Sequence, residues 1–187
     1  QVLESGRLSF SRQGDFVKRF EKEFSRYFHK KYAVSTTSGT TALHTALGVL
    51  ALKPRDEILV PALTFVSSAS VILQEKAKPV FVDVIKGTFN LDPKDLEMKI
   101  TPKSKAIIVV HLYGLPAEMT AIMKIARRYN LKVIEDCAQA PGAKYVGKYA
   151  GSFGDLACFS FQQTKNMTCG EVGMVITDNE VRYRRCA

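Results

Sequence analysis

Tryptophan is absent from this 187-residue sequence, and histidine and cysteine are scarce, with three and four residues. The cysteines form no C-x-x-C pair, and no group of cysteine and histidine has the spacing of a zinc site. No apolar run approaches the ~20 residues that cross a bilayer, and the first residues lack the basic-then-apolar order of a secretory signal. We therefore expect a reduced, cytoplasmic protein with no metal site and no membrane span.

Acidic residues are fewer than basic ones: 18 Asp and Glu stand against 27 Lys and Arg, which gives a net charge of +9. The basic residues are scattered along the chain, and no zinc finger, RNP pattern or clear helix-turn-helix accompanies them. A nucleic-acid-binding module therefore rests on net charge alone, and we expect no nucleic acid as a partner. The charge is compatible with small anionic ligands.

Short apolar stretches alternate with longer segments of helical pattern. The predicted strands are 33–35, 58–60, 79–84, 106–110, 132–134, 156–161 and 174–177. The predicted helices are 15–29, 41–52, 65–74, 92–99 and 117–129. This alternation predicts an α/β fold with a mostly parallel sheet and helices on both faces. Ligands of such folds bind beyond the carboxyl ends of the strands.

The first predicted helix has a phenylalanine at every fourth position: Phe16, Phe20, Phe24 and Phe28. Such a stripe covers either the core of the same chain or the surface of a partner. We expect core packing, because most apolar stripes on amphipathic helices face the core.

Three short segments carry residues suited to chemistry. Thr37-Ser38-Gly39-Thr40, between a strand and a helix, is suited to hold a phosphate on helix N–H groups, although the motif alone favours an ordinary helix cap. Asp136 ends a buried strand, where it either pairs with a cationic nitrogen or caps the next turn. Lys165 follows another strand, and is either a nucleophilic amine in the cleft or a loop lysine in solvent. Together, a phosphate cradle, an acid and a nucleophilic lysine are the minimal protein parts of a pyridoxal-phosphate site.

Six stretches resemble, in order and over nearly the whole chain, the DegT/DnrJ/EryC1/StrS family of sugar aminotransferases, which have the aspartate-aminotransferase fold. They are SGTTALH (38–44), DEILVPALTF (56–65), PVFVDV (79–84), HLYG (111–114), IEDCAQA (134–140) and SFQQTKNMTCGEVG (160–173). The resemblance implies that the chain is the large domain of a type I pyridoxal-phosphate-dependent transferase. Members of this family carry a further C-terminal small domain, so we expect residues 1–187 to be an N-terminal segment plus a large cofactor-binding domain, without the small domain.

The resemblance also implies roles for single residues. Gly39, Thr40 and Ser160 would bind the phosphate of the cofactor. Lys165 would form the Schiff base with pyridoxal phosphate and move protons as acid and base, and it argues against the dehydrases of the family, which have histidine there.

The cofactor ring has its own set of implied contacts. Phe65 would stack on the pyridine ring, Asp136 would pair with the ring nitrogen, and Gln139 would contact the region of the 3-hydroxyl. Two departures from the family pattern stand close to the lysine: Val172 replaces a usual glycine and Cys169 a common threonine. A branched side chain at position 172 is expected to strain the turn if the backbone there needs glycine.

The function implied is transamination of a nucleotide-linked keto-sugar with an amino acid donor such as glutamate, in amino-sugar or polysaccharide biosynthesis. A homodimer is the expected assembly. An inactive cofactor-binding fragment and a non-catalytic interaction protein are the alternatives that the sequence leaves open.

Overall fold

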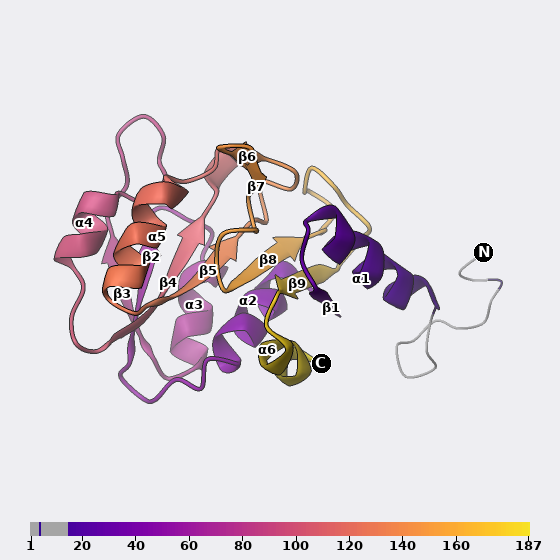
Figure 1. Ribbon diagram of the computed structural model, residues 1–187, viewed down its shortest axis with the longest axis horizontal. Helices are drawn as coiled ribbons and strands as arrows, with labels where there is room; N and C mark the ends of the chain where they lie inside the picture. The colour runs from indigo at the N-terminus through magenta and orange to yellow at the C-terminus, as the bar shows by residue number, and fades with distance from the viewer. Residues whose placement is uncertain (1–3, 5–14) are drawn as a thin grey trace.

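The computed structural model describes Glu4 and residues 15–187, and their elements alternate as predicted (Figure 1). The strands are β1 (Tyr32–Thr36), β2 (Glu57–Pro61), β3 (Lys78–Val82), β4 (Ser104–Val110), β5 (Lys132–Asp136), β6 (Lys144–Tyr145), β7 (Lys148–Tyr149), β8 (Leu156–Ser160) and β9 (Gly173–Thr177). The helices are α1 (Asp15–Tyr27), α2 (Gly39–Gly48), α3 (Ser67–Gln74), α4 (Pro93–Met98), α5 (Met119–Arg128) and α6 (Glu180–Cys186), with a 3-10 turn at Leu112–Gly114. Among these helices none is long and apolar enough to span a membrane.

Seven strands form one sheet in the order β1-β9-β8-β5-β4-β2-β3. Strand β9 is antiparallel to both of its neighbours, and every other pairing in this sheet is parallel. The predicted α/β fold with a mostly parallel sheet is therefore confirmed. Strands β6 and β7 form a separate hairpin that the sequence analysis did not predict, with a turn in which Val146 and Gly147 both have positive φ.

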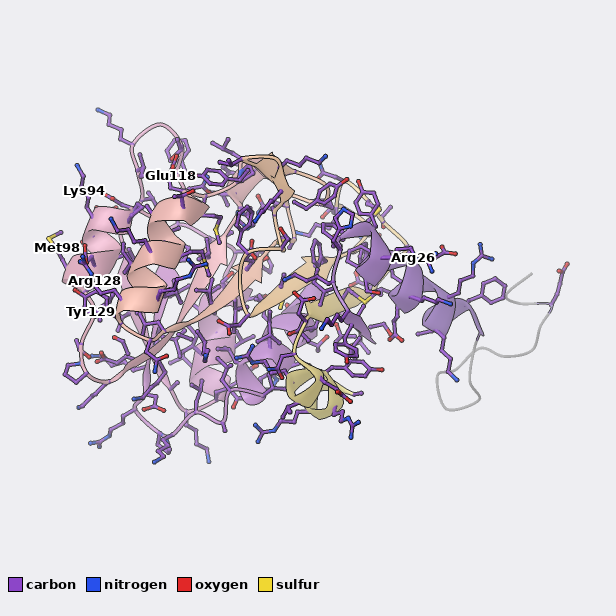
Figure 2. The ribbon with its side chains drawn as sticks, viewed as in Figure 1. Arg26, Lys94, Met98, Glu118, Arg128 and Tyr129 are labelled. Carbon is purple, nitrogen blue, oxygen red and sulfur yellow. The ribbon has the colours of Figure 1, made fainter. Side chains whose placement is uncertain are left out.

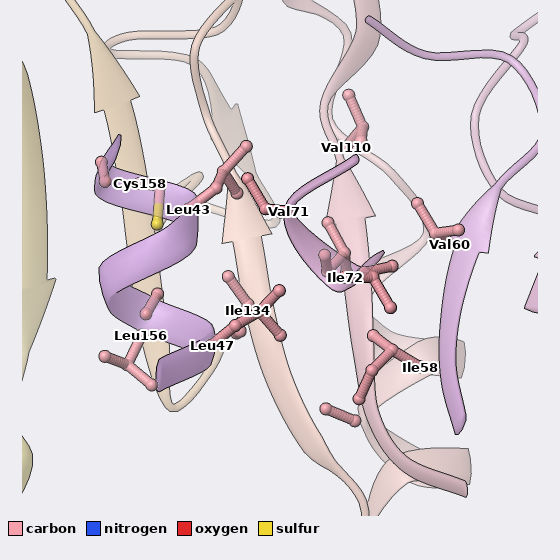
Figure 3. Packing of buried hydrophobic residues seen from close by; sticks show 14 of the residues in the cluster. Leu43, Leu47, Ile58, Val60, Val71, Ile72, Val110, Ile134, Leu156 and Cys158 are labelled. Carbon is pink, nitrogen blue, oxygen red and sulfur yellow. The ribbon is translucent and has the colours of Figure 1, made fainter. Parts of the chain in front are cut away.

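The sheet is covered by helices on both faces (Figure 1). On one face, α2 and α3 pack on a cluster of aliphatic side chains that includes Leu43, Leu47 and Ile134 (Figure 3). On the other face, α4 and α5 cover a second cluster around Leu59 and Val109. Alternate residues of the buried strands point to opposite faces, so each strand contributes to both clusters.

Helix α1 covers the part of the sheet formed by β8 and β9. Phe24 and Phe28 are buried, and Phe20 packs edge-on against Phe161 with ring centroids 5.2 Å apart. Phe16, the second residue of the helix, is 40% exposed. The predicted core role of this stripe is thus confirmed for three of its four members.

At the far end of the sheet, α4 and α5 are joined at their surfaces. Figure 2 shows Arg128 and Tyr129, at the end of α5, beside Met98 of α4. Arg128 Nη1 donates to Glu97 Oε1 at 2.6 Å, and the Tyr129 hydroxyl donates to the same oxygen at 3.3 Å. This contact joins the surfaces of α4 and α5 on the face away from α2.

Helix α2 begins two residues earlier than the sequence predicts. The reason is a capping box: Ser38 Oγ accepts the N–H of Thr41 at 3.1 Å, and Thr41 Oγ1 accepts the N–H of Ser38 at 2.9 Å. Gly39 and Thr40 thereby become the first two residues of the helix, which matters for the site described next.

Candidate functional site

A cavity of about 330 Å³ lies at the carboxyl ends of β4, β5 and β8, beside the start of α2. Every residue to which the sequence analysis gives a site role lines it: Gly39, Thr40, Phe65, Asp136, Gln139, Ser160 and Lys165. These residues come from four separate segments of the chain, and the sheet brings them together. The role of each one stays a prediction.

One end of the cavity is the N-terminus of α2. Helix geometry leaves the N–H groups of Gly39 and Thr40 without partners inside the helix, and the positive end of the helix dipole lies at the same place. Ser38 caps the helix through Thr41, so the cap predicted as an alternative is present. The cap and an anion site do not compete, because the cap uses the N–H of the third residue only.

Gly39 is in close contact with Ser160, which ends β8. A Cβ on residue 39 would lie 2.7 Å from the Cβ of Ser160, which is closer than side chains approach. Ser160 itself is 7% exposed and lines the cavity. The glycine therefore lets the helix N-terminus approach the end of β8, and both can reach the same ligand atoms.

Asp136 forms the floor of the cavity at the end of β5. It is 6% exposed; its Oδ1 accepts the N–H of Ala138 at 3.1 Å, and its Oδ2 accepts the hydroxyl of Ser68 at 2.9 Å. Burial raises the pKa of Asp136 above its ordinary value, and the two donors and the nearby Lys165 amine oppose that rise. One oxygen thus caps the following turn, as the alternative interpretation expects, while the carboxylate still faces the cavity.

Phe65 and Lys165 face each other across the opening. The Lys165 Nζ lies 5.8 Å from the centre of the Phe65 ring, and that ring is 62% exposed. Lys165 is placed by a turn in which its N–H donates to the carbonyl of Gln162 at 2.8 Å. The Gln162 side chain closes the same turn, because its Oε1 accepts both the N–H and the hydroxyl of Thr164.

Gln139 follows Asp136 on the same side of the cavity. Its Oε1 accepts the N–H of Tyr113 at 2.8 Å. The backbone of Tyr113 has a φ of 53°, a conformation that residues other than glycine rarely adopt. With Oε1 engaged, the amide NH₂ of Gln139 is the group with which this residue can reach a ligand oxygen.

Three hydroxyls near the cavity escaped the sequence analysis. Thr64, Ser67 and Ser68 lie at and just before the start of α3, next to Phe65. Ser67 Oγ lies 2.7 Å from Thr40 Oγ1, and Ser68 Oγ lies 2.9 Å from Thr64 Oγ1. A serine pair at a helix start is typical of a cap, so no signal in the sequence assigned these residues to the site.

Behind the cavity, Glu135 is fully buried and holds a loop in place. Its two oxygens accept the N–H groups of Gly151, Phe153 and Gly154 at 2.6–2.8 Å. Its fourth partner is His111 at 3.0 Å, and since His111 Nδ1 accepts the N–H of Ala117, the ring carries its proton on Nε2 and donates it to Glu135.

His111, Glu135 and Cys137 bring potential metal-ligand atoms within 4.8 Å of one another. Both nitrogens of His111 and both oxygens of Glu135 are used in hydrogen bonds within the protein. A metal ion would have to break these bonds, so the cluster is better described as a hydrogen-bonded core.

The two departures near Lys165 cause no strain in the backbone. Val172 is not among the described residues with positive φ, and its side chain packs against the cluster beneath α1. Cys169 is exposed. The position that requires glycine is Gly173, where a Cβ would collide with the carbonyl of Ser38. The expectation of backbone strain at position 172 is therefore wrong.

Comparison with known proteins shows the family of the chain. The family model of the DegT/DnrJ/EryC1/StrS aminotransferases matches residues 1–187. A GDP-perosamine synthase of Escherichia coli O157:H7 is 46% identical over 176 residues, which cover 94% of this chain and 48% of that protein. A 3-oxo-glucose-6-phosphate:glutamate aminotransferase of Bacillus subtilis is 41% identical over 187 residues, which cover 100% of this chain and 41% of that protein.

Solved structures with a similar fold have similar sequences too. The crystal structure of ntda from Bacillus subtilis, with bound cofactor pmp, has a TM-score of 0.85 and 40% sequence identity, and the match covers 91% of this chain and 39% of that one. The chain thus spans about half the length, or less, of the proteins that it matches. The match of the family model over the whole sequence shows that this chain belongs to the DegT/DnrJ/EryC1/StrS aminotransferase family.

Proposed function

We propose that this chain forms the cofactor-binding part of a pyridoxal-phosphate-dependent aminotransferase that acts on a nucleotide-linked keto-sugar. The observation that carries the proposal is the shared cavity of Lys165, Asp136 and the N-terminus of α2. These groups are an amine, a buried carboxylate and an anion site, and pyridoxal phosphate has an aldehyde, a ring nitrogen and a phosphate to match them.

The fit can be judged from the residues themselves. At Gly39 a side chain would collide with Ser160, so only glycine leaves the helix N–H groups within reach of a phosphate. At Asp136 burial raises the pKa of the carboxyl, and a cation placed against it would favour the charged form again. The exposed ring of Phe65 offers a flat apolar surface to an aromatic ligand.

When bound, pyridoxal phosphate supplies an electron sink that stabilises negative charge beside the nitrogen being transferred. In the proposed mechanism Asp136 holds a proton at the ring nitrogen, which keeps that sink effective. Lys165 would take a proton from the carbon on one side of the transferred nitrogen and return it to the carbon on the other side, as general base and then general acid. Gln139 would donate its NH₂ to the oxygen on the ring.

The substrates and the assembly are part of the proposal. A GDP-sugar product is named for one relative and glutamate for the other, which supports a keto-sugar acceptor and glutamate as donor. A homodimer in the cytoplasm stays the expected state. Exposed apolar side chains beside the cavity, among them Leu63, Phe65 and Val66, support a partner surface there.

Binding of pyridoxal phosphate to the 187-residue chain tests the proposal. The cofactor should give a visible absorption band, borohydride should fix it to the protein, and peptide mapping should find it on Lys165. Lys165→Ala should abolish both band and label, whereas Lys144→Ala and Lys148→Ala, on the β6–β7 hairpin, should change neither. A label on Lys144 or Lys148 would show that the lysine has been assigned wrongly.

A transamination assay with glutamate and a nucleotide-linked keto-sugar separates an active enzyme from the two alternatives. A chain that binds the cofactor on Lys165 but has no turnover is an inactive cofactor-binding fragment. A chain that binds no cofactor at all supports the non-catalytic interaction protein and contradicts the proposal.

A further inference from the structure

Helix α3 begins with two consecutive serines that do not cap it. The residue at the cap position is Val66, and the helix has no side-chain cap. Serine at a helix start normally accepts a backbone N–H. Here the two hydroxyls leave the helix in different directions: Ser67 Oγ lies 2.7 Å from Thr40 Oγ1, and Ser68 Oγ lies 2.9 Å from Asp136 Oδ2.

The direction of the hydrogen bonds around Ser68 follows from the number of protons that each group can donate. Ser68 is fully buried and has a single proton to donate. An ionised Asp136 only accepts, so that proton goes to Oδ2. Thr64 Oγ1, 2.9 Å from Ser68 Oγ, must then donate to Ser68. The result is a directed chain of hydroxyls from Thr64 through Ser68 to Asp136.

The two oxygens of Asp136 are therefore held from two sides. Oδ1 is held by the backbone N–H of Ala138 and Oδ2 by the side chain of Ser68. The backbone contact belongs to the turn after β5, and any acid at this position could make it. The Ser68 contact comes from a different element, and it fixes how the carboxylate is rotated in the floor of the cavity.

We propose that Ser68 is a positioning residue that holds the Asp136 carboxylate in the orientation in which it meets the ring nitrogen of the cofactor, with Thr64 as the residue that orients Ser68. This inference rests on the proposed function. Ser68 does not line the cavity, whereas Asp136 and Thr64 do, so Ser68 acts through Asp136.

Two ligands separate this role from a general effect on the fold. One is pyridoxal phosphate, and the other is its analogue with carbon in place of the ring nitrogen, which offers Asp136 no N–H. In Ser68→Ala the affinity for pyridoxal phosphate should fall roughly tenfold, because a hydrogen bond to a charged group is lost. The affinity for the analogue should stay within about twofold of that of the unchanged protein. Adding Ser68→Ala to Asp136→Asn should cause no further loss for either ligand.

Neighbouring serines on α3 are matched controls. Ser67→Ala removes the contact with Thr40 at the phosphate end, so both ligands should lose affinity alike. Ser70→Ala, one turn farther, removes only a 3.5 Å contact with the carbonyl of Ser67 and should change neither affinity. Circular dichroism and denaturant unfolding establish that each variant is folded.

A readout without cofactor keeps the inference separate from the proposed function. The carboxyl carbon of Asp136, followed by NMR in labelled protein, reports its titration directly. The Ser68 hydroxyl lowers the pKa of Asp136, so in Ser68→Ala the midpoint should move to higher pH. An unchanged midpoint, or an equal loss of both ligands in Ser68→Ala, overturns the inference. If the unchanged protein binds no pyridoxal phosphate, the proposed function fails, and the NMR titration still decides whether Ser68 holds Asp136.

Discussion

Gly39 and Ser160 are 121 positions apart in the chain, yet a Cβ on Gly39 would lie 2.7 Å from the Cβ of Ser160. This contact joins the start of α2 to the end of β8 and closes one end of the cavity. It leaves no space for any side chain at position 39.

We expect Gly39→Ala to weaken the binding of pyridoxal phosphate by at least tenfold. The added methyl must push α2 away from β8, which moves the N–H groups that face the phosphate, and overpacking of this kind costs about 1–3 kcal/mol of stability. Equilibrium titration and urea unfolding measure the two effects. Gly48→Ala is the control, because a Cβ there lies 3.5 Å from Glu75 Oε1, an ordinary contact; its affinity should not change.

Asp136→Asn should retain the fold and bind the cofactor more weakly, and its transamination should fall further than its affinity. The charge-assisted hydrogen bond to the ring nitrogen is worth about 1.5–3 kcal/mol. Catalysis loses more, because a ring nitrogen without its proton weakens the electron sink. Affinity comes from titration and turnover from a coupled glutamate assay. Near-normal turnover would show that Asp136 serves only as the cap of the next turn.

The pH dependence of stability should report the burial of Asp136. Since burial raises the pKa of Asp136 above 3.8, the folded state binds its proton more tightly than the unfolded state does. Stability from this group is therefore complete below the unfolded pKa and is lost as pH rises through the folded pKa. The free energy of unfolding of the unchanged protein, minus that of Asp136→Asn, should fall as the pH rises from about 3.8. A difference that rises over this window would contradict the assigned direction.

Glu135→Gln should destabilise the fold strongly, by roughly 3 kcal/mol or more, because four donors lose a fully buried charged acceptor. An amide also turns its own N–H groups toward those donors. Thermal and urea unfolding measure the loss. Glu97→Gln is the comparison: it removes the negative charge from the surface contact with Arg128 and should cost far less. Similar losses in both variants would show that the loop does not depend on Glu135.

The 187-residue chain alone should associate as a dimer or in larger species, bind pyridoxal phosphate weakly and show little turnover. Val66 is 69% exposed beside the cavity, in a group of apolar side chains. Val66→Ser should reduce association in sedimentation velocity. Val146→Asn, which changes an 80% exposed valine on the β6–β7 hairpin, should not. A stable monomer with full turnover would contradict this prediction.

The apolar pattern of the sequence predicts the buried strands of the main sheet closely. Each strand of the main sheet overlaps its predicted range, since runs such as Ile107, Ile108 and Val109 are apolar on both faces of the sheet. The hairpin of β6 and β7 escaped prediction because each of its strands has only two residues, which is too few for any periodicity.

The long motifs predict which residues gather at the cavity, while supporting contacts escape prediction, and the role of each site residue stays a prediction. Asp136 ends β5 and Lys165 follows β8, on the side of the sheet where a parallel sheet gathers its ligand groups. Ser68 could not be assigned, because its hydroxyl has an obvious local use as a cap and its actual partner is 68 positions away. Glu135 lies within the motif IEDCAQA (134–140), but the three N–H groups that it binds come from a loop that has no sequence signal of its own.

The position of β1 has a consequence for synthesis of the chain. Strand β1 leads directly into the start of α2 beside the cavity, and among the described residues its partner in the sheet is β9, about 140 residues later. At 5–20 residues per second, a ribosome needs roughly seven to thirty seconds to make that stretch. During this interval β1 has no strand to pair with. The nascent chain therefore has a waiting period in which a chaperone, or early contacts with α1, must keep this end from aggregating.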